Sequence, residues 1–334
     1  MMRVLRVGLA GAGWVTQHHL DAWATQSSHA TVVAIADPNL AAARARAAQF
    51  DIPAVYDSAE AMVHALQLDA IDIAAPREFH APICRLAAQH GLAILCQKPL
   101  APTLAEAEAL VRDVGDTVPF MVHENWRFRP HYRRIAAWLS DGAIGAVRRV
   151  AMNVLTSGLL PDPSGRLPAL VRQPMLARLD RMLVMEILIH HIDTLRFLLG
   201  PLTLQAAILG KSCNEIRGED RATLLLRTPG GAAVTLNGDF MAHGHPPEQR
   251  DALEIAGENG SIVLSGDSLH MTGITEERET LDLAANYSAS YEAAIAHFLD
   301  GVQRGALFET SPADNLETLR VVEAAYRMSG EAAD

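Results

Sequence analysis

Short runs of apolar residues alternate with alanine-rich amphipathic stretches from residue 3 to about residue 122. The alternation predicts βαβ units, because short apolar runs are typical of buried strands and the stretches between them repeat with the period of a helix. Strands are expected at residues 3–10, 31–36, around Val55, 70–75, 92–96 and 119–122, with helices at about 14–26, 39–50, 58–66, 79–90 and 103–114. The strands read as apolar throughout, as strands covered on both faces should be. We therefore expect a Rossmann fold, a doubly wound parallel sheet of six strands.

From Val147 onward, apolar and polar residues alternate along short runs with a period of about two residues. A period of two buries one face of a strand and exposes the other, which is typical of antiparallel sheets. Such runs cover residues 147–157, 204–212, 222–228, 232–240, 252–257 and 261–266, with helices at about 181–199, 289–303 and from Ser311 onward. The α/β chain is thus expected to have a Rossmann domain over residues 1–122 and an α+β domain with a large, mostly antiparallel open sheet over residues 123–334.

Composition excludes several classes of partner. The chain carries 28 Lys and Arg against 39 Asp and Glu, a net charge of −11, and no block of basic residues, so we expect no nucleic-acid partner. No segment approaches the roughly 18 uncharged apolar residues of a membrane span, so we expect no membrane partner. Three glycines interrupt the apolar stretch near the start, which argues against a signal peptide. Three cysteines without metal-type spacing favour the cytoplasm.

A glycine-containing turn joins the first predicted strand to the first predicted helix. Gly11 allows a tight turn, Gly13 lets the backbone approach a pyrophosphate, and the helix N-terminus supplies free N–H groups. We assign Gly11, Gly13, Trp14 and Val15 to a cofactor site. Thr16 replaces the third glycine of the dinucleotide fingerprint, which is expected to weaken packing between helix and strand.

Asp37 follows the second predicted strand at the spacing where a carboxylate accepts both ribose hydroxyls of an adenosine. Its charge repels a 2′-phosphate, so NAD is favoured over NADP as the cofactor. The alternative is an ordinary helix cap, and both roles are compatible. Arg44 or Arg46 would soften the preference for NAD.

Lys98 stands at the end of the fifth predicted strand, and Lys211 is the second of only two lysines in this arginine-rich chain. Ligands of doubly wound sheets bind at the carboxyl ends of the strands, and Pro99 holds Lys98 in an extended conformation. Arginine replaces lysine easily as a surface charge but does not exchange a proton, so a retained lysine suggests chemistry. The alternative is a solvated charge at a strand end.

The chain resembles the glucose-fructose oxidoreductase and inositol dehydrogenase family, often written Gfo/Idh/MocA. The matching segments keep their order along the chain and cover residues 8–23, 36–39, 74–110, 128–134, 186–200 and 311–329. The resemblance implies an NAD(P)-dependent oxidoreductase acting on the CH–OH group of a sugar or polyol. It also implies a homodimer or homotetramer formed through the open sheet.

Several family motifs map onto this sequence with replacements. The family's Glu-Lys-Pro is Gln97-Lys98-Pro99 here, which implies that Lys98 belongs to the active site; the neutral Gln97 is expected to let Lys98 release its proton more readily. The family's Thr-Pro-Asn is Ala75-Pro76-Arg77, and the histidine that follows it is His80. The cofactor contacts implied in this region are Ala75, Pro76, His80, Gln97 and Lys98.

The family's Asp-x-x-x-His is Glu186-x-x-x-His190 here, in an otherwise apolar stretch. Glu186, His190 and Asp193 form one polar stripe on the predicted helix, and burying such groups alone costs several kcal/mol, so we expect the stripe to face a cleft. The alternative is that Glu186 and His190 satisfy each other. His243 and His245 raise a metal alternative, but the helix lacks a second histidine one turn away and we expect no metal.

These residues suggest hydride transfer between NAD and a carbinol carbon, with an aldose-type substrate favoured. His190 is expected to accept the hydroxyl proton and Lys98 to stabilise the developing alkoxide. Glu186 is expected to orient His190 or to bind an adjacent hydroxyl. Asn153 is expected to bind substrate beside these three. Arg127 is expected to contact cofactor or substrate, with a hinge salt bridge as its alternative. An NAD-using glycosidase of the same family and a non-catalytic nucleotide or sugar sensor are alternative functions.

Overall fold

A computed structural model describes residues 3–330. It divides into two compact units. The first contains the chain up to Arg129 together with Tyr287–Glu317, and the second contains Pro130–Asn286 together with the chain from Thr318. The chain therefore leaves the first unit twice, after Arg129 and after Glu317, and returns to it once, at Tyr287.

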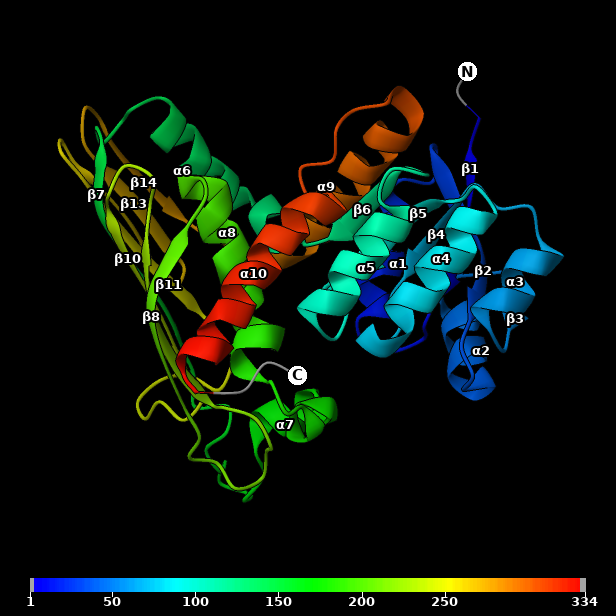
Figure 1. Cartoon of the computed structure of the whole chain (residues 1–334), viewed down its shortest axis with the longest axis horizontal. Coiled ribbons are helices and arrows are strands. Elements are labelled where there is room, and N and C mark those ends of the chain that lie inside the picture. Colours follow the sequence, from blue (N-terminus) through cyan, green and yellow to red (C-terminus); the bar gives the residue numbers. More distant parts are fainter. Residues whose placement is uncertain (1–2, 331–334) are drawn as a thin grey trace. The chain divides into compact units, whose positions relative to one another are not determined.

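Six parallel strands build the sheet of the first unit (Figure 1). They are β1 (Leu5–Ala10), β2 (Ala30–Ala36), β3 (Ala54–Tyr56), β4 (Ala70–Ile73), β5 (Ala93–Gln97) and β6 (Phe120–His123), in the order β3-β2-β1-β4-β5-β6. The connecting helices are α1 (Thr16–Thr25), α2 (Leu40–Gln49), α3 (Ala59–Ala65), α4 (His80–Gln89) and α5 (Leu104–Val114), with a 3-10 turn η1 (Arg77–Phe79) before α4. This strand order, reversing beside β1, is that of the Rossmann fold.

Helices cover both faces of this sheet because its strands are apolar on both sides. Val7 and Leu9 of β1 pack with α1, α2 and with α9 (Leu283–Arg304), while Gly8 between them faces Met62 of α3. Three buried polar residues break the apolar pattern. Asp72 lies within β4 with no exposed surface, Gln97 ends β5, and His123 ends β6. The expectation of strands that are apolar throughout is therefore wrong at Asp72.

Eight strands build the sheet of the second unit, in the order β14-β13-β12-β11-β7-β10-β9-β8. They are β7 (Val147–Leu155), β8 (Thr203–Gly210), β9 (Arg221–Arg227), β10 (Ala233–Asp239), β11 (Asp251–Gly257), β12 (Ser261–Ser265), β13 (Ser268–Thr272) and β14 (Glu276–Thr280). Neighbours are antiparallel except β7 and β10, which are parallel. A mostly antiparallel sheet is confirmed.

The remaining helices are α6 (Pro130–Ser140), α7 (Pro168–Arg172), a π-helical turn η4 (Leu183–Leu188) continued by α8 (Ile189–Leu199), and α10 (Pro312–Met328). Short 3-10 turns η2 (Trp126–Phe128) and η3 (Pro174–Arg178) precede α6 and η4. A Cβ at Gly238 of β10 would touch Leu183 and Leu188, so η4 packs on one face of the sheet, where Figure 1 also draws α8. Elements α6, α7, β13 and β14 were not predicted from the sequence.

Candidate active site

The glycine turn after β1 has the backbone geometry that a pyrophosphate site needs. Gly11 has φ +110°, and a Cβ there would lie 2.5 Å from the carbonyl oxygen of Ala74, so no side chain fits. A Cβ at Gly13 would meet no heavy atom within 4 Å, so the approach to the turn is open there. Thr16 begins α1, is fully buried and donates its hydroxyl to the Gly11 carbonyl at 3.1 Å. This hydrogen bond ties the first residue of α1 to the glycine turn. The weaker packing between helix and strand stays a prediction.

Asp37 fastens this turn to the end of β2. Its Oδ2 accepts the N–H of Ala12 at 2.8 Å, and its Oδ1 accepts the N–H of Asn39 at 2.7 Å. The cap of α2 is Asn39, whose side chain accepts the N–H of Ala42. Asp37 is therefore not the cap of that helix, and each of its oxygens keeps capacity for a further hydrogen bond.

Aromatic side chains surround the start of α1. The half-exposed Trp14 contacts His18 edge-on, and His18 in turn contacts Tyr287 and Tyr291 of α9. Burial lowers the pKa of His18 despite the opposing effect of Asp21, and burial together with Tyr287 raises the pKa of Tyr291. Both groups are therefore uncharged near neutral pH.

Two loops at the carboxyl ends of β4 and β5 are tied together by His80. Its Nε2 lies 2.8 Å from the carbonyl oxygen of Ala75, and its Nδ1 lies 2.9 Å from that of Pro99. Both ring nitrogens are thus engaged by backbone, and the ring is buried. His80 fixes the positions of the segments that carry Pro76 and the half-buried Lys98.

A buried polar network lies beneath Lys98. Gln97 accepts the N–H of Lys98 at 3.2 Å, and its Nε2 lies 2.8 Å from Nε2 of His19 and 3.3 Å from Nδ1 of His123. Nδ1 of His19 lies 2.8 Å from Oδ2 of Asp72, which also accepts the indole N–H of Trp23 at 2.7 Å. α1 contributes His19 and Trp23 to this network, and β4, β5 and β6 contribute one polar side chain each.

Sequence reasoning did not include His19, Asp72 or His123 in the site. The signal that points to them is the carboxylate of Asp72 inside an otherwise apolar strand, because a buried charge requires hydrogen-bond partners. The identity of those partners is not visible in the sequence, since His19 and Trp23 lie in α1, far from Asp72 along the chain, and His19 is linked through Gln97 of β5 to His123 of β6.

Glu186 lies in the π-helical turn η4, and His190 lies in the first turn of α8. Glu186 is the one partly exposed residue between Met182 and His190. The buried carboxylate of Glu219 holds the start of this turn by accepting the N–H groups of Val184 at 2.8 Å and Met182 at 3.2 Å. π-Helical turns are rare and occur frequently at functional sites.

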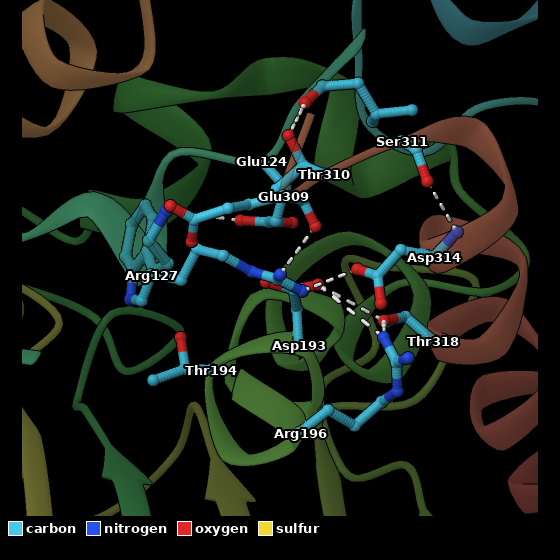
Figure 2. Close-up of polar contacts among 12 residues, drawn as sticks. Glu124, Arg127, Asp193, Thr194, Arg196, Glu309, Thr310, Ser311, Asp314 and Thr318 are labelled. Atoms are coloured by element: carbon cyan, nitrogen blue, oxygen red, sulfur yellow. Dashed lines mark hydrogen bonds and ion pairs between the residues drawn. The ribbon is translucent and has the colours of Figure 1, made fainter. Parts of the chain in front are cut away.

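Tyr326 of α10 completes the anchor of η4. Its hydroxyl donates to Glu219 at 2.5 Å and accepts the N–H of Met185 at 3.2 Å. Asp193 accepts the hydroxyl of Thr318 of α10 at 3.3 Å and lies 4.0 Å from Arg196 (Figure 2). Its carboxylate therefore links α8 to α10, whereas the sequence predicted that it would face a cleft together with Glu186 and His190.

The contacts of Arg127 favour a structural salt bridge over a contact to cofactor or substrate. Its guanidinium donates to the carbonyl oxygen of Glu309 at 2.9 Å and to the carboxylate of Asp314 at 2.7 Å (Figure 2). Arg127 is 5% exposed. A buried ion pair of this kind fastens the segment after β6 to the start of α10.

Asn153 lies on the face of the second sheet opposite η4. Gly238, which faces η4, pairs with Val154, and consecutive residues of a strand point to opposite faces. The side chain of Asn153 accepts a hydrogen bond from Asn237 of β10 at 2.9 Å on that opposite face. Asn153 and Glu186 of η4 therefore lie on opposite faces of this sheet.

Within residues 3–330, no group of three or more His, Cys, Asp and Glu side chains is arranged to hold a metal ion. His243 and His245 lie in an exposed loop. No helix in the same range combines the length and the apolar character needed to cross a membrane.

Two family models match the chain. The first, an oxidoreductase family with an NAD-binding Rossmann fold, covers residues 5–117, and the second, the C-terminal alpha/beta domain of that oxidoreductase family, covers residues 177–332. The chain belongs to the Gfo/Idh/MocA family of oxidoreductases. The predicted family, fold class and cofactor NAD are confirmed by these matches, and the chain is an NAD-dependent dehydrogenase.

Individual relatives agree over nearly the whole length. A D-apiose dehydrogenase from Paraburkholderia graminis is 34% identical over 97% of this chain and 87% of the relative. An inositol 2-dehydrogenase from Rhizobium meliloti is 30% identical over 98% of this chain and 97% of the relative. The crystal structure of an oxidoreductase from Agrobacterium radiobacter in complex with NAD+, L-tartaric acid and magnesium superposes with a TM-score of 0.90 at 29% identity, covering 98% of this chain and 97% of that one.

Proposed function

We propose that this dehydrogenase oxidises a carbinol carbon of a sugar or polyol, with an aldose-type substrate favoured. The observation that carries the cofactor part is Asp37, which is bonded to the glycine turn but not used as the cap of α2. Gly11, Gly13, Trp14 and Val15 would hold the pyrophosphate side of NAD, and Asp37 would accept the ribose hydroxyls. The support for the substrate class is that similar proteins are dehydrogenases of D-apiose and inositol.

The bound NAD supplies the hydride acceptor, and the protein handles the proton. Lys98, held by Gln97 and by the His80 bridge, would stabilise the negative charge that develops on the substrate oxygen. His190 would accept the hydroxyl proton and Glu186 would orient His190 or bind an adjacent hydroxyl. Ala75 and Pro76 would line the cofactor site beside Lys98.

We also propose that the enzyme is a homo-oligomer and that it lies in the cytoplasm. The open face of the eight-stranded sheet exposes Ile208 and Leu225, and covering it in a homodimer or homotetramer would remove apolar surface from water. Free, buried cysteines support a cytoplasmic location, since disulfides are rare there. Neither a glycosidase nor a sensor is favoured, because the similar proteins named above are dehydrogenases.

A panel of aldoses and polyols incubated with NAD tests the proposal. We expect the absorbance of NADH to rise with at least one aldose or polyol, and thermal stability to rise when that compound is added with NAD, because ligand binding stabilises the folded state. No NADH with any member of the panel, despite measurable NAD binding, would contradict the proposed substrate class.

A further inference from the structure

We propose that Gln97 is a positioning residue that holds His19 and His123 as neutral tautomers beneath Lys98. The inference deepens the proposed function and rests on it only for the role of Lys98, since the hydrogen bonds of Gln97 are independent of any substrate. It gives a reason for an amide at the position where the resembling family usually has a carboxylate.

The orientation of the Gln97 amide follows from its backbone contact. The backbone nitrogen of Lys98 can only donate, so the side-chain atom 3.2 Å from it must be the oxygen. The NH2 group then faces the two imidazoles, at 2.8 Å from Nε2 of His19 and 3.3 Å from Nδ1 of His123. An NH2 group carries two hydrogens, so Gln97 can donate to both rings at once.

These two donations fix where each imidazole carries its proton. Nε2 of His19 must accept, so its proton is on Nδ1 and is donated to Asp72 at 2.8 Å. Nδ1 of His123 must accept, so its proton is on Nε2. An imidazolium at either position would bring one N–H group against another. His19 and His123 have no exposed surface and Gln97 is 8% exposed, so bulk water does not relieve that conflict.

The groups that face this network are mostly uncharged. Tyr291 of α9 packs against the rings of both histidines, and burial keeps its hydroxyl protonated by raising its pKa, with Glu124 acting in the same direction and Arg129 opposing it. Burial and the Cys84 thiol raise the pKa of Cys96 on β5, to which Asp72 also contributes.

Asp72 of β4 is a charged group in direct contact with the network. Its Oδ2 is stabilised by two neutral donors, Nδ1–H of His19 and the indole N–H of Trp23. His18, the neighbour of His19 on α1, is kept neutral by the burial that lowers its pKa.

Replacing Gln97 by Glu reverses the donor pattern. A carboxylate at position 97 offers only acceptors, so Nε2 of His19 would need a proton of its own while Nδ1 still donates to Asp72. The substitution Gln97→Glu is therefore expected to convert His19 into an imidazolium between two carboxylates. The pocket beneath Lys98 would then bind one more proton than in the native protein.

Nitrogen-15 NMR of histidine-labelled protein tests the inference. In the native protein we expect the neutral pattern with the proton on Nδ1 for His19 and on Nε2 for His123. In Gln97→Glu, measured under the same conditions, we expect an imidazolium pattern for His19. The His19→Gln and His123→Gln variants identify the signals by their loss.

Gln89→Glu is the matched control, because Gln89 is exposed at the end of α4 and the change of charge is the same. It should leave both histidine patterns unchanged. The Gln97→Met variant, which removes the amide donors, should give mixed tautomers for His19 and serves if Gln97→Glu does not fold.

A charged or Nε2-protonated His19 in the native protein would overturn the inference, and so would a His19 pattern that none of the position 97 variants alters. Because these spectra need no substrate, they separate this inference from the proposed function. The same variants connect it to catalysis. The pH profile of NADH formation in Gln97→Glu should gain one ionisation that the native and Gln89→Glu proteins lack.

Discussion

The carboxylate of Asp37 accepts the backbone N–H of Ala12 at 2.8 Å, so the end of β2 is fastened to the glycine turn that follows β1. The same carboxylate is the group expected to select NAD. One side chain thus shapes the turn and, in the proposed function, would also accept the ribose hydroxyls.

Asp37→Ala should lower the affinity for NADH about tenfold or more, because a hydrogen bond to a charged group contributes roughly 1.5–3 kcal/mol. The affinity for NADPH should fall less, since the repulsion of its 2′-phosphate disappears at the same time. Titrations monitored by tryptophan fluorescence measure the dissociation constants of NADH and NADPH. Glu60→Ala, at an exposed position of α3, is the control. Equal losses for NADH and NADPH would contradict the assignment of Asp37 to the ribose.

Lys98→Met should lower kcat/KM about a thousandfold, because the variant lacks the charge that stabilises the substrate oxygen as it loses its proton. NADH affinity should change much less. The second lysine provides a control in the same chain: Lys211→Met removes an exposed lysine and should keep full activity. A Lys98→Met enzyme as active as Lys211→Met would remove Lys98 from the catalytic site.

His18 should make stability depend on pH. Burial lowers the pKa of His18 in the folded state, so His18 is protonated at a higher pH in the unfolded chain than in the folded protein. The free energy of unfolding should therefore fall as the pH is lowered from about 7 to about 5. In His18→Phe this part of the loss should disappear, whereas His245→Phe in an exposed loop should retain it. Thermal unfolding at the two pH values measures the difference. The same pH dependence in both variants would argue against a buried neutral His18.

Glu219 should control both stability and the geometry of η4. Glu219→Ala leaves the N–H groups of Met182 and Val184 and the hydroxyl of Tyr326 without their acceptor, which should lower the free energy of unfolding by about 3 kcal/mol or more. Tyr326→Phe keeps the ring and should cost about 1 kcal/mol. Denaturant titration gives both values. In both variants kcat should fall while NADH affinity stays constant, and unchanged kcat would show that η4 does not position Glu186.

The periodicity of apolar residues predicted those helices and strands that bury an apolar face or run. Five of the six parallel strands and η4 with α8 have strong apolar runs, so burial identifies them, whereas β3 is three half-buried residues that the sequence indicates only around Val55. β14 contains no apolar residue in Glu276–Thr280, and it is a strand because it pairs with β13 at the sheet edge. α6 was missed because its arginines hide an apolar face formed by Tyr132, Ile135 and Trp138.

The candidate site was predictable where one segment carries the signal. The glycine turn, Asp37 and Lys98 each follow a predicted strand, and the topology of a parallel sheet places such residues at one edge. The contacts of His80 and Gln97 were not predictable, because their partners come from other loops and strands. The face on which Asn153 lies depends on the pairing of β7 with β10, which the sequence does not reveal.

Isotope transfer tests the central claim most directly. The protein is incubated with NAD and with an aldose or polyol deuterated at the reacting carbinol carbon, and the reduced cofactor is analysed by mass spectrometry. Direct hydride transfer predicts NADH that carries the deuterium. Reduced cofactor without deuterium, or no reduced cofactor with any aldose or polyol, would contradict the account.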